Sequence, residues 1–136
     1  MSIARLATAC ALSLLAAQLA LGDERNCATD KGAVHTLKFK VKDDGCVEKV
    51  KKDSDGANAD EIRVCETDVV KWKVSGKKKS IVFEGASPFE WTDSGFKAND
   101  IEGTVKSGTA GQPPFKYSVK VDGLDCVLDP KIIVVP

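Results

Sequence analysis

The stretch FKYSVKVDGLDCVLDPKIIVV, residues Phe115–Val135, decides the fold of this chain. Its first seven residues alternate between apolar and polar side chains, which is typical of a strand with one buried face; the apolar positions are Phe115, Tyr117, Val119 and Val121. Asp122-Gly123 then ends the strand, and Cys126 lies in the loop that follows. Ile132–Val135 is apolar on both faces, which indicates a strand buried inside a sheet. The C-terminal part therefore predicts a strand, a short loop and a closing strand.

The first 22 residues have the features of a signal peptide. Arg5 supplies a positive charge, Leu6–Leu21 is almost entirely apolar, and Ala20-Leu21-Gly22 is a small-x-small cleavage site. The alternative is a retained N-terminal anchor, which the length argues against because a bilayer span needs roughly 20 apolar residues. We expect residues 1–22 to be removed, residues 23–136 to form a single domain, and the mature chain to have no stable membrane insertion.

Charge and cysteine content limit the possible partners and the compartment. The 20 basic and 20 acidic side chains cancel, so no overall positive field attracts nucleic acid. Four cysteines remain after Gly22, an even number in an exported chain, and they predict two disulfides and a periplasmic or secreted location; they are Cys27, Cys46, Cys65 and Cys126. Their spacings contain no Cys-x-x-Cys pattern, and no cofactor or metal is predicted.

The rest of the chain predicts short strands separated by turns. Alternating or apolar segments occur at His35–Val41, Cys46–Val50, Ile62–Val64, Val70–Val74 and Ile81–Phe83, with a further short strand near Gly103–Lys106. The polar segment Lys51–Glu61 predicts a surface loop, and Glu84–Pro114 predicts a long crossover. No segment has a sustained helical period. The sequence therefore predicts an all-β fold, a two-sheet sandwich.

This order of strands resembles the cupredoxins, small exported Greek-key β-sandwich proteins that include plastocyanin-like and azurin-like copper proteins. The resemblance covers most of Leu37–Val135 and rests on the order of Val70-Lys71-Trp72-Lys73-Val74, the loop before Ile81–Phe83, the strand with Tyr117, and the terminal Ile132–Val135. The segment Leu128–Val134 is also similar to the ending of uncharacterised bacterial cupredoxin-like proteins. An unrelated immunoglobulin-like sandwich is the alternative, and parallel first and third strands would distinguish the cupredoxin plan from it.

The copper ligands of that family are missing from this sequence. The positions that carry the family's first histidine, its cysteine and its methionine fall at about Lys79, Val119 and Leu128. A type 1 copper site needs two imidazoles and a thiolate, whereas the only histidine in the chain is His35. The resemblance therefore implies the fold without type 1 copper.

The resemblance also implies how the cysteines pair. In cupredoxins the first and third strands run parallel, so the turn with Cys46 lies at the same end as the final loop with Cys126. By the same comparison, Cys27 and Cys65 share the opposite end. The implied pairs are Cys46–Cys126 and Cys27–Cys65, one of three possible connectivities for four cysteines.

Two groups of residues form a possible binding surface at the loops. Lys77, Lys78 and Lys79 form a basic triplet that would suit a small anionic ligand or an acidic protein, although a solvated loop explains it more simply. Phe89, Trp91 and Phe96 either form an aromatic contact surface or fix the crossover to the core. The lysines of the alternating strands, such as Lys38–Lys42 and Lys71–Lys73, predict solvated faces that also protect sheet edges.

No arrangement of residues points to catalysis, since His35 lies at the edge of a predicted strand without a nucleophile beside it. We therefore expect an exported non-catalytic domain with a binding or structural role, and a partner that the sequence does not identify. It would act through the loops of Gly76–Ser80, Gly85–Gly95 and Gly123–Pro130. The alternative is a periplasmic copper-binding or electron-transfer protein with the atypical ligands His35, Asp129 and Cys126.

Overall fold

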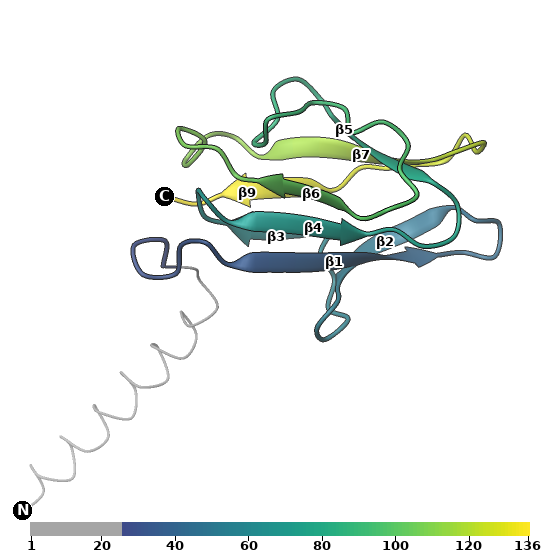
Figure 1. The fold of residues 1–136 in the computed structure, drawn as a ribbon, viewed down its shortest axis with the longest axis horizontal. Helices are drawn as coiled ribbons and strands as arrows, with labels where there is room; N and C mark the ends of the chain where they lie inside the picture. The colour runs from purple at the N-terminus through teal and green to yellow at the C-terminus, as the bar shows by residue number, and fades with distance from the viewer. Residues whose placement is uncertain (1–25) are drawn as a thin grey trace, which may run out of the picture.

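The computed structural model describes residues 26–136, and the predicted signal peptide lies outside them. The described residues contain nine strands and no helix, so the predicted all-β class is confirmed (Figure 1). The strands are β1 (Val34–Val41), β2 (Val47–Lys52), β3 (Glu61–Val64), β4 (Val69–Lys73), β5 (Lys79–Phe83), β6 (Ile101–Thr104), β7 (Phe115–Val121), β8 (Val127–Leu128) and β9 (Lys131–Val134).

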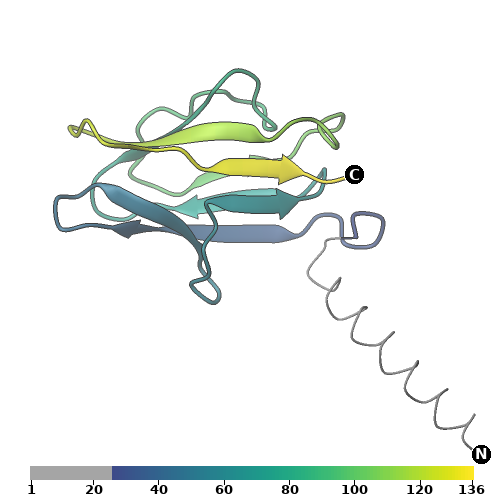
Figure 2. The same cartoon turned by 180° about the vertical axis from the view of Figure 1, so that it is seen from behind.

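The strands form two mixed sheets that lie face to face, as in a β-sandwich (Figure 2). The first sheet has the order β2-β1-β4-β6, and the second has the order β3-β9-β7-β5 with β8 paired to β7. In the first sheet β1 runs parallel to β4, while in the second β3 runs parallel to β9; the remaining pairs are antiparallel. The first strand is thus parallel to β4, the strand that follows Cys65, which the resemblance counts as the third strand.

The core between the sheets is formed by the apolar positions of the alternating strands. Trp72 of β4 is fully buried and contacts Tyr117 of β7, with ring centroids 5.6 Å apart. The indole N–H of Trp72 also donates to the hydroxyl of Tyr117 over 3.3 Å. Burial raises the pKa of Tyr117, so this hydroxyl stays neutral. Buried aromatic side chains remove large apolar areas from water, which explains why Trp72 occupies the centre of the core.

Most strand bounds differ from the sequence prediction by one or two residues, and three elements call for comment. Strand β5 begins at Lys79, which pairs with Val121 of β7 and is buried like Ile81 and Phe83. Strand β6 is Ile101–Thr104, where Ile101 is buried and pairs with Trp72. The sequence predicts a loop at the two residues of β8, because a strand of two residues is too short to show alternation.

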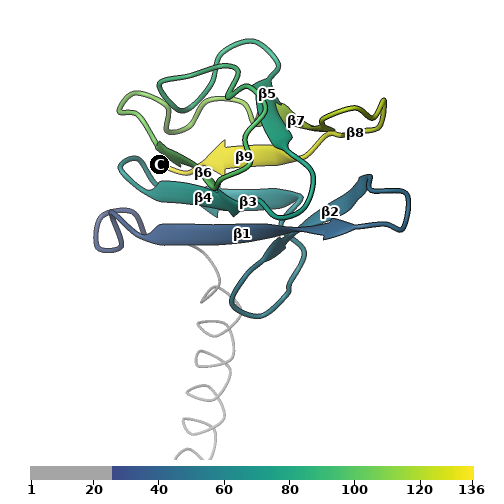
Figure 3. The same cartoon turned by 45° about the vertical axis from the view of Figure 1, so that its right-hand side comes forward.

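The crossover that follows β5 returns along the outer edge of that strand (Figure 3). The amide of Phe83 donates to the carbonyl of Thr92, and Lys79 and Lys97 exchange two backbone hydrogen bonds of 3.0 and 2.8 Å. These bonds cover an edge that would otherwise expose unpaired donors and acceptors. Gly85 therefore lies at the opposite end of β5 from Lys79, and only the second half of the predicted Gly85–Gly95 loop approaches the lysine triplet.

The sandwich has two different ends. The β1–β2 turn and the β7–β8 loop lie at one end, which we call the loop end (Figure 1). The segment before β1, the β3–β4 turn and the end of β9 lie at the other, which we call the terminal end.

Candidate functional site

A disulfide closes the loop end of the molecule. Cys46, after the β1–β2 turn, is bonded to Cys126, in the β7–β8 loop, with a Cα–Cα distance of 5.9 Å. Both cysteines are half-buried. Gly45 makes the turn possible because its φ of 90° is in the region that favours glycine. This connection is the one that the resemblance implied, and it places the final loop against the first turn.

A buried lysine fills the adjoining part of the loop end. The side chain of Lys79 is only 2% exposed, and its ammonium donates to the carbonyls of Ser75 and Lys77 over 2.7 and 2.9 Å. The same nitrogen lies 5.9 Å from the ring centroid of Phe39, within the range of a cation–π contact. Burial lowers the pKa of Lys79. The ammonium thus holds the β4–β5 loop to the core at the position where the resemblance places the first metal ligand.

The predicted lysine triplet therefore does not act as one exposed group. Lys77 and Lys78 are exposed, whereas Lys79 points into the protein. The side chain of Lys77 lies beside Gly45, and the carbonyl of Lys78 accepts a hydrogen bond from the amide of Asp122. Two of the three lysines thus remain at the surface near the Cys46–Cys126 disulfide.

The three aromatic residues of the crossover differ in how deeply they are buried. Phe89 is 1% exposed and lies against Gly103 so closely that a Cβ there would be 2.8 Å from its ring. Trp91 is half-buried and stacks on Phe89 with centroids 5.3 Å apart. Phe96 is 49% exposed. Phe89 and Trp91 fix the crossover to the core, and Phe96 is the member that offers an aromatic surface to solvent.

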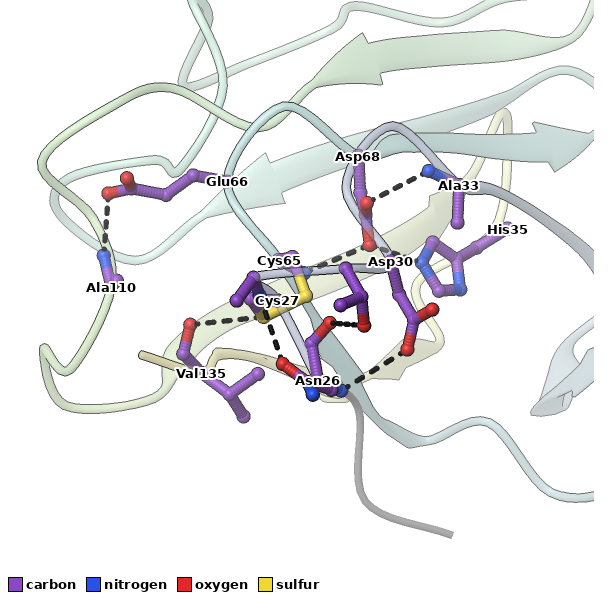
Figure 4. Close-up of a disulfide and its surroundings, with 12 residues drawn as sticks. Asn26, Cys27, Asp30, Ala33, His35, Cys65, Glu66, Asp68, Ala110 and Val135 are labelled. Carbon is purple, nitrogen blue, oxygen red and sulfur yellow. Dashed lines mark hydrogen bonds and ion pairs between the residues drawn. A yellow bond between two sulfur atoms is a disulfide. The ribbon is translucent and has the colours of Figure 1, made fainter. Parts of the chain in front are cut away.

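The terminal end carries a buried carboxylate that the sequence analysis missed. Asp68 is completely buried and accepts hydrogen bonds from the amides of Ala33 and Cys65 and from Nε2 of His35, over 3.0, 2.9 and 2.8 Å (Figure 4). A buried charge is stable only when such donors surround it. The single histidine thus positions the start of β1 against the β3–β4 turn. The only sequence feature that could have indicated this role is an Asp three residues after a cysteine, in the turn Cys65-Glu66-Thr67-Asp68. Aspartates are too common in turns for this feature to be diagnostic.

The second disulfide lies within the same network. Cys27 and Cys65 are 9% and 0% exposed, and their Cα atoms are 5.4 Å apart. The sulfur of Cys27 is 3.6 Å from the carbonyl oxygen of Val135, near the C-terminus (Figure 4). Since a disulfide sulfur carries no hydrogen, this contact is one of packing. The bond connects the segment before β1, the β3–β4 turn and the last strand.

A second carboxylate of this end holds the loop between β6 and β7. Glu66 accepts hydrogen bonds from the amides of Thr109 and Ala110 over 2.9 and 3.1 Å. The backbone hydrogen bond from Ala110 is the main reason why the pKa of Glu66 is lowered. Both acidic residues of the β3–β4 turn therefore act on the backbone of other segments.

A groove of about 540 Å³ lies between the first half of β1 and strand β3. Its lining is mostly polar and includes Val34, His35, Asp53, Glu61 and Arg63. The imidazole of His35 is held by Asp68 through Nε2. The nearby Cys27 and Cys65 are bonded to each other, so neither sulfur is a thiolate nucleophile.

The alternative copper ligands do not lie together. His35 is at the terminal end with Asp68, Cys126 is at the loop end in a disulfide, and Asp129 accepts a hydrogen bond from the hydroxyl of Ser118. Within residues 26–136, no three side chains of His, Cys, Asp or Glu are grouped as metal ligands would be.

Comparison with known proteins does not assign the chain. No protein-family model matches the sequence, and no curated protein matches it. Across the described part of the chain, no helix is long and apolar enough to cross a bilayer. Two intramolecular disulfides are characteristic of proteins that fold in an oxidising compartment outside the cytoplasm.

Proposed function

We propose that this protein is a periplasmic or secreted, non-catalytic domain of the cupredoxin-like Greek-key type, which lacks type 1 copper and acts by binding. Three features of the strands support the fold: β1 is parallel to β4, β3 is parallel to β9, and the chain ends with a strand, a short loop and a buried strand. The predicted signal peptide, residues 1–22, and the two disulfides support export.

One observation carries the functional part of the proposal. The end of the sandwich where the resemblance places copper is occupied by the Cys46–Cys126 disulfide and by the ammonium of Lys79. A disulfide sulfur is a poor metal ligand because the thiolate is the binding form. A lysine ammonium is a donor without a lone pair for a metal. These two groups perform the structural task that a bound metal would perform, which is to hold the loops together.

The role of His35 supports a non-catalytic function. Its Nε2 is paired with a fully buried carboxylate that also binds two backbone amides, so the imidazole is part of the structure of the terminal end. Binding then takes place on the surface of a rigid, cross-linked sandwich.

The proposal is tested by metal analysis and a thiol count on the mature, oxidised protein. We expect no reactive thiol in 6 M guanidinium and no stoichiometric copper after incubation with Cu(II) or Cu(I) and gel filtration. The Cys126→Ser variant, which exposes one thiol at Cys46, is the positive control for the thiol assay. One equivalent of bound copper, or a free Cys126 in the native protein, would overturn the proposal in favour of a copper-binding or electron-transfer protein.

A further inference from the structure

Six lysines lie on the outer face of the first sheet. They alternate with the buried residues of three neighbouring strands, so their side chains share the solvent side, and we call them the lysine face: Lys38 and Lys40 of β1, Lys49 and Lys51 of β2, and Lys71 and Lys73 of β4. The strands lie side by side in the order β2-β1-β4.

The register aligns these lysines in rows across the sheet. Lys38 is opposite Lys51 on one side and opposite Lys73 on the other, and Lys40 is opposite Lys49. Like charges directly opposite each other in a sheet are destabilising. The arrangement therefore costs folding free energy, and it is not imposed by composition, since basic and acidic residues are equal in number in the whole chain.

Carboxylates form ion pairs with three of the six lysines. Lys40, Lys71 and Lys73 form ion pairs with Glu48, Asp100 and Asp53 over 3.2, 3.6 and 3.2 Å. Among the described residues, no ion pair is formed by Lys38, Lys49 or Lys51. Lys38 and its β2 neighbours Lys49 and Lys51 are thus three adjacent cations without a direct ion pair, next to and on the edge strand of the sheet.

The outer face of the second sheet is different. There Lys131 pairs with Glu61 over 3.1 Å, and Ser118 separates Lys116 from Lys120 along β7. In that sheet Lys116 is opposite Lys131 and Lys120 is opposite Ser80, so no row of lysines crosses three strands. The concentration of positive charge is a property of one face.

The geometry of a sheet determines which partner this face fits. Neighbouring strands are about 4.8 Å apart and alternate residues along a strand about 6.7 Å apart, so the ammonium groups form a flat grid. Such a grid matches anionic groups repeated along a linear polymer. No aromatic or large aliphatic side chain lies between Lys38, Lys49 and Lys51 on this face to enter a lipid bilayer or to stack on nucleic acid bases.

We propose that the lysine face binds a linear anionic polysaccharide outside the cytoplasm. The inference rests on the proposed role as an exported binding domain and adds the surface and the class of partner to it. Lys38, Lys49 and Lys51 contribute most to binding, because they have no competing carboxylate within ion-pair distance.

The test uses size-defined heparin as the sulfated probe and polygalacturonate as the carboxylate probe. Calorimetry at 50 and 150 mM NaCl compares the mature protein with the Lys38→Gln/Lys49→Gln/Lys51→Gln variant. We expect at least about a tenfold loss of affinity for one or both probes, equivalent to about 1.4 kcal/mol. The control is Lys97→Gln/Lys116→Gln/Lys120→Gln, which removes the same charge from exposed positions elsewhere. We expect its affinity to change less than twofold.

Three results would overturn the inference. The first is no binding of either probe by the mature protein at 150 mM NaCl, and the second is an equal loss in the control variant. The third is tighter binding of anionic phospholipid vesicles or of a single-stranded oligonucleotide than of both polysaccharides. Circular dichroism and thermal unfolding verify that both variants are folded, and we expect removal of opposed lysines to leave the Tm unchanged or higher. A negative result for polysaccharide binding does not change the outcome of the thiol count or the copper analysis, so the two proposals are tested separately.

Discussion

The two ends of this sandwich use the same covalent bond in opposite surroundings. At the terminal end, Cys27–Cys65 is buried and adjoins a carboxylate that accepts three hydrogen bonds. At the loop end, Cys46–Cys126 is half-exposed and adjoins a lysine ammonium bonded to two carbonyls. The first end is stabilised by a buried anion and the second by a buried cation. The disulfide of the terminal end is therefore part of the protein core, whereas the disulfide of the loop end fixes the conformation of surface loops.

Removing each disulfide tests this difference with the largest expected effect. The sequence separations of 38 and 80 residues correspond to chain-entropy contributions of about 4 and 4.5 kcal/mol. Because Cys27–Cys65 is also packed in the core, we expect Cys27→Ala/Cys65→Ala to lose more stability than Cys46→Ala/Cys126→Ala, in spite of its shorter loop. Urea unfolding of both variants measures the order, and a larger loss at the loop end would contradict the comparison.

The rate of reduction distinguishes the two bonds in the unaltered protein. A small thiol or phosphine must reach a sulfur atom to open a disulfide, so access controls the rate. We expect Cys46–Cys126 to be reduced first under native conditions, with Cys27–Cys65 opening only when the protein unfolds. Alkylation of the released thiols followed by peptide mass spectrometry identifies the order. Simultaneous opening of both bonds would show that the terminal end is not protected.

Two aspartates that bind a disulfide cysteine permit a matched comparison of the ends. Asp68 accepts the amide of Cys65 and is buried, while Asp44 accepts the amide of Cys46 and is exposed, both over 2.9 Å. An Asn at position 68 would present an amide N–H₂ to at least one donor, so we expect Asp68→Asn to lose about 3 kcal/mol of unfolding free energy. We expect Asp44→Asn to lose about 0.5 kcal/mol or less. Equal losses in urea unfolding would contradict the distinction.

The buried cation of the loop end gives a smaller, pH-dependent effect. We expect Lys79→Met to lose about 1–2 kcal/mol, since two carbonyls lose their donor while water reaches the exposed β4–β5 loop. The lowered pKa of Lys79 means that the unfolded chain binds more protons between the folded pKa and the ordinary value of 10.5. The free energy of unfolding of the unaltered protein should therefore increase with pH in that window. The Lys79→Met variant should not show this increase. Unfolding at pH 7 and at successive values up to 10.5 measures it.

The fold was largely predictable because burial alternates along the strands. Phe115, Tyr117, Val119 and Val121 are all buried in the structure, as their spacing indicated. The same alternation places Lys79 inside, two residues before buried Ile81, but its charge and its lysine neighbours are typical of a solvated loop. Lys79 is buried here because two backbone carbonyls accept hydrogen bonds from its ammonium. The position of those carbonyls depends on the folded loop, which the local sequence pattern does not show.

The candidate sites were less predictable for the same reason. The role of Asp68 depends on donors that are 35 and 33 residues away at Ala33 and His35, and no local pattern in the turn encodes them. The rows of the lysine face depend on the register between strands, which joins residues such as Lys38 and Lys73 across a parallel pair. The sequence showed the alternation on each strand, but the alignment across strands is visible only in the folded sheet.

The half-buried carboxylate of Glu66 at the terminal end provides the smallest and most specific test. Glu66 has a pKa below its ordinary value of 4.5, mainly because the amide of Ala110 donates to it. Its contribution to stability is therefore complete above pH 4.5 and is lost as the pH falls through the lowered folded pKa. Glu66→Gln keeps an acceptor oxygen but removes the charge, so we expect a slightly lower Tm at pH 7 and almost the same Tm as the unaltered protein at pH 2. If the Tm difference persisted undiminished at pH 2, the bonds to Thr109 and Ala110 would owe their strength to geometry rather than charge, and the terminal end would be held by a single buried anion, Asp68.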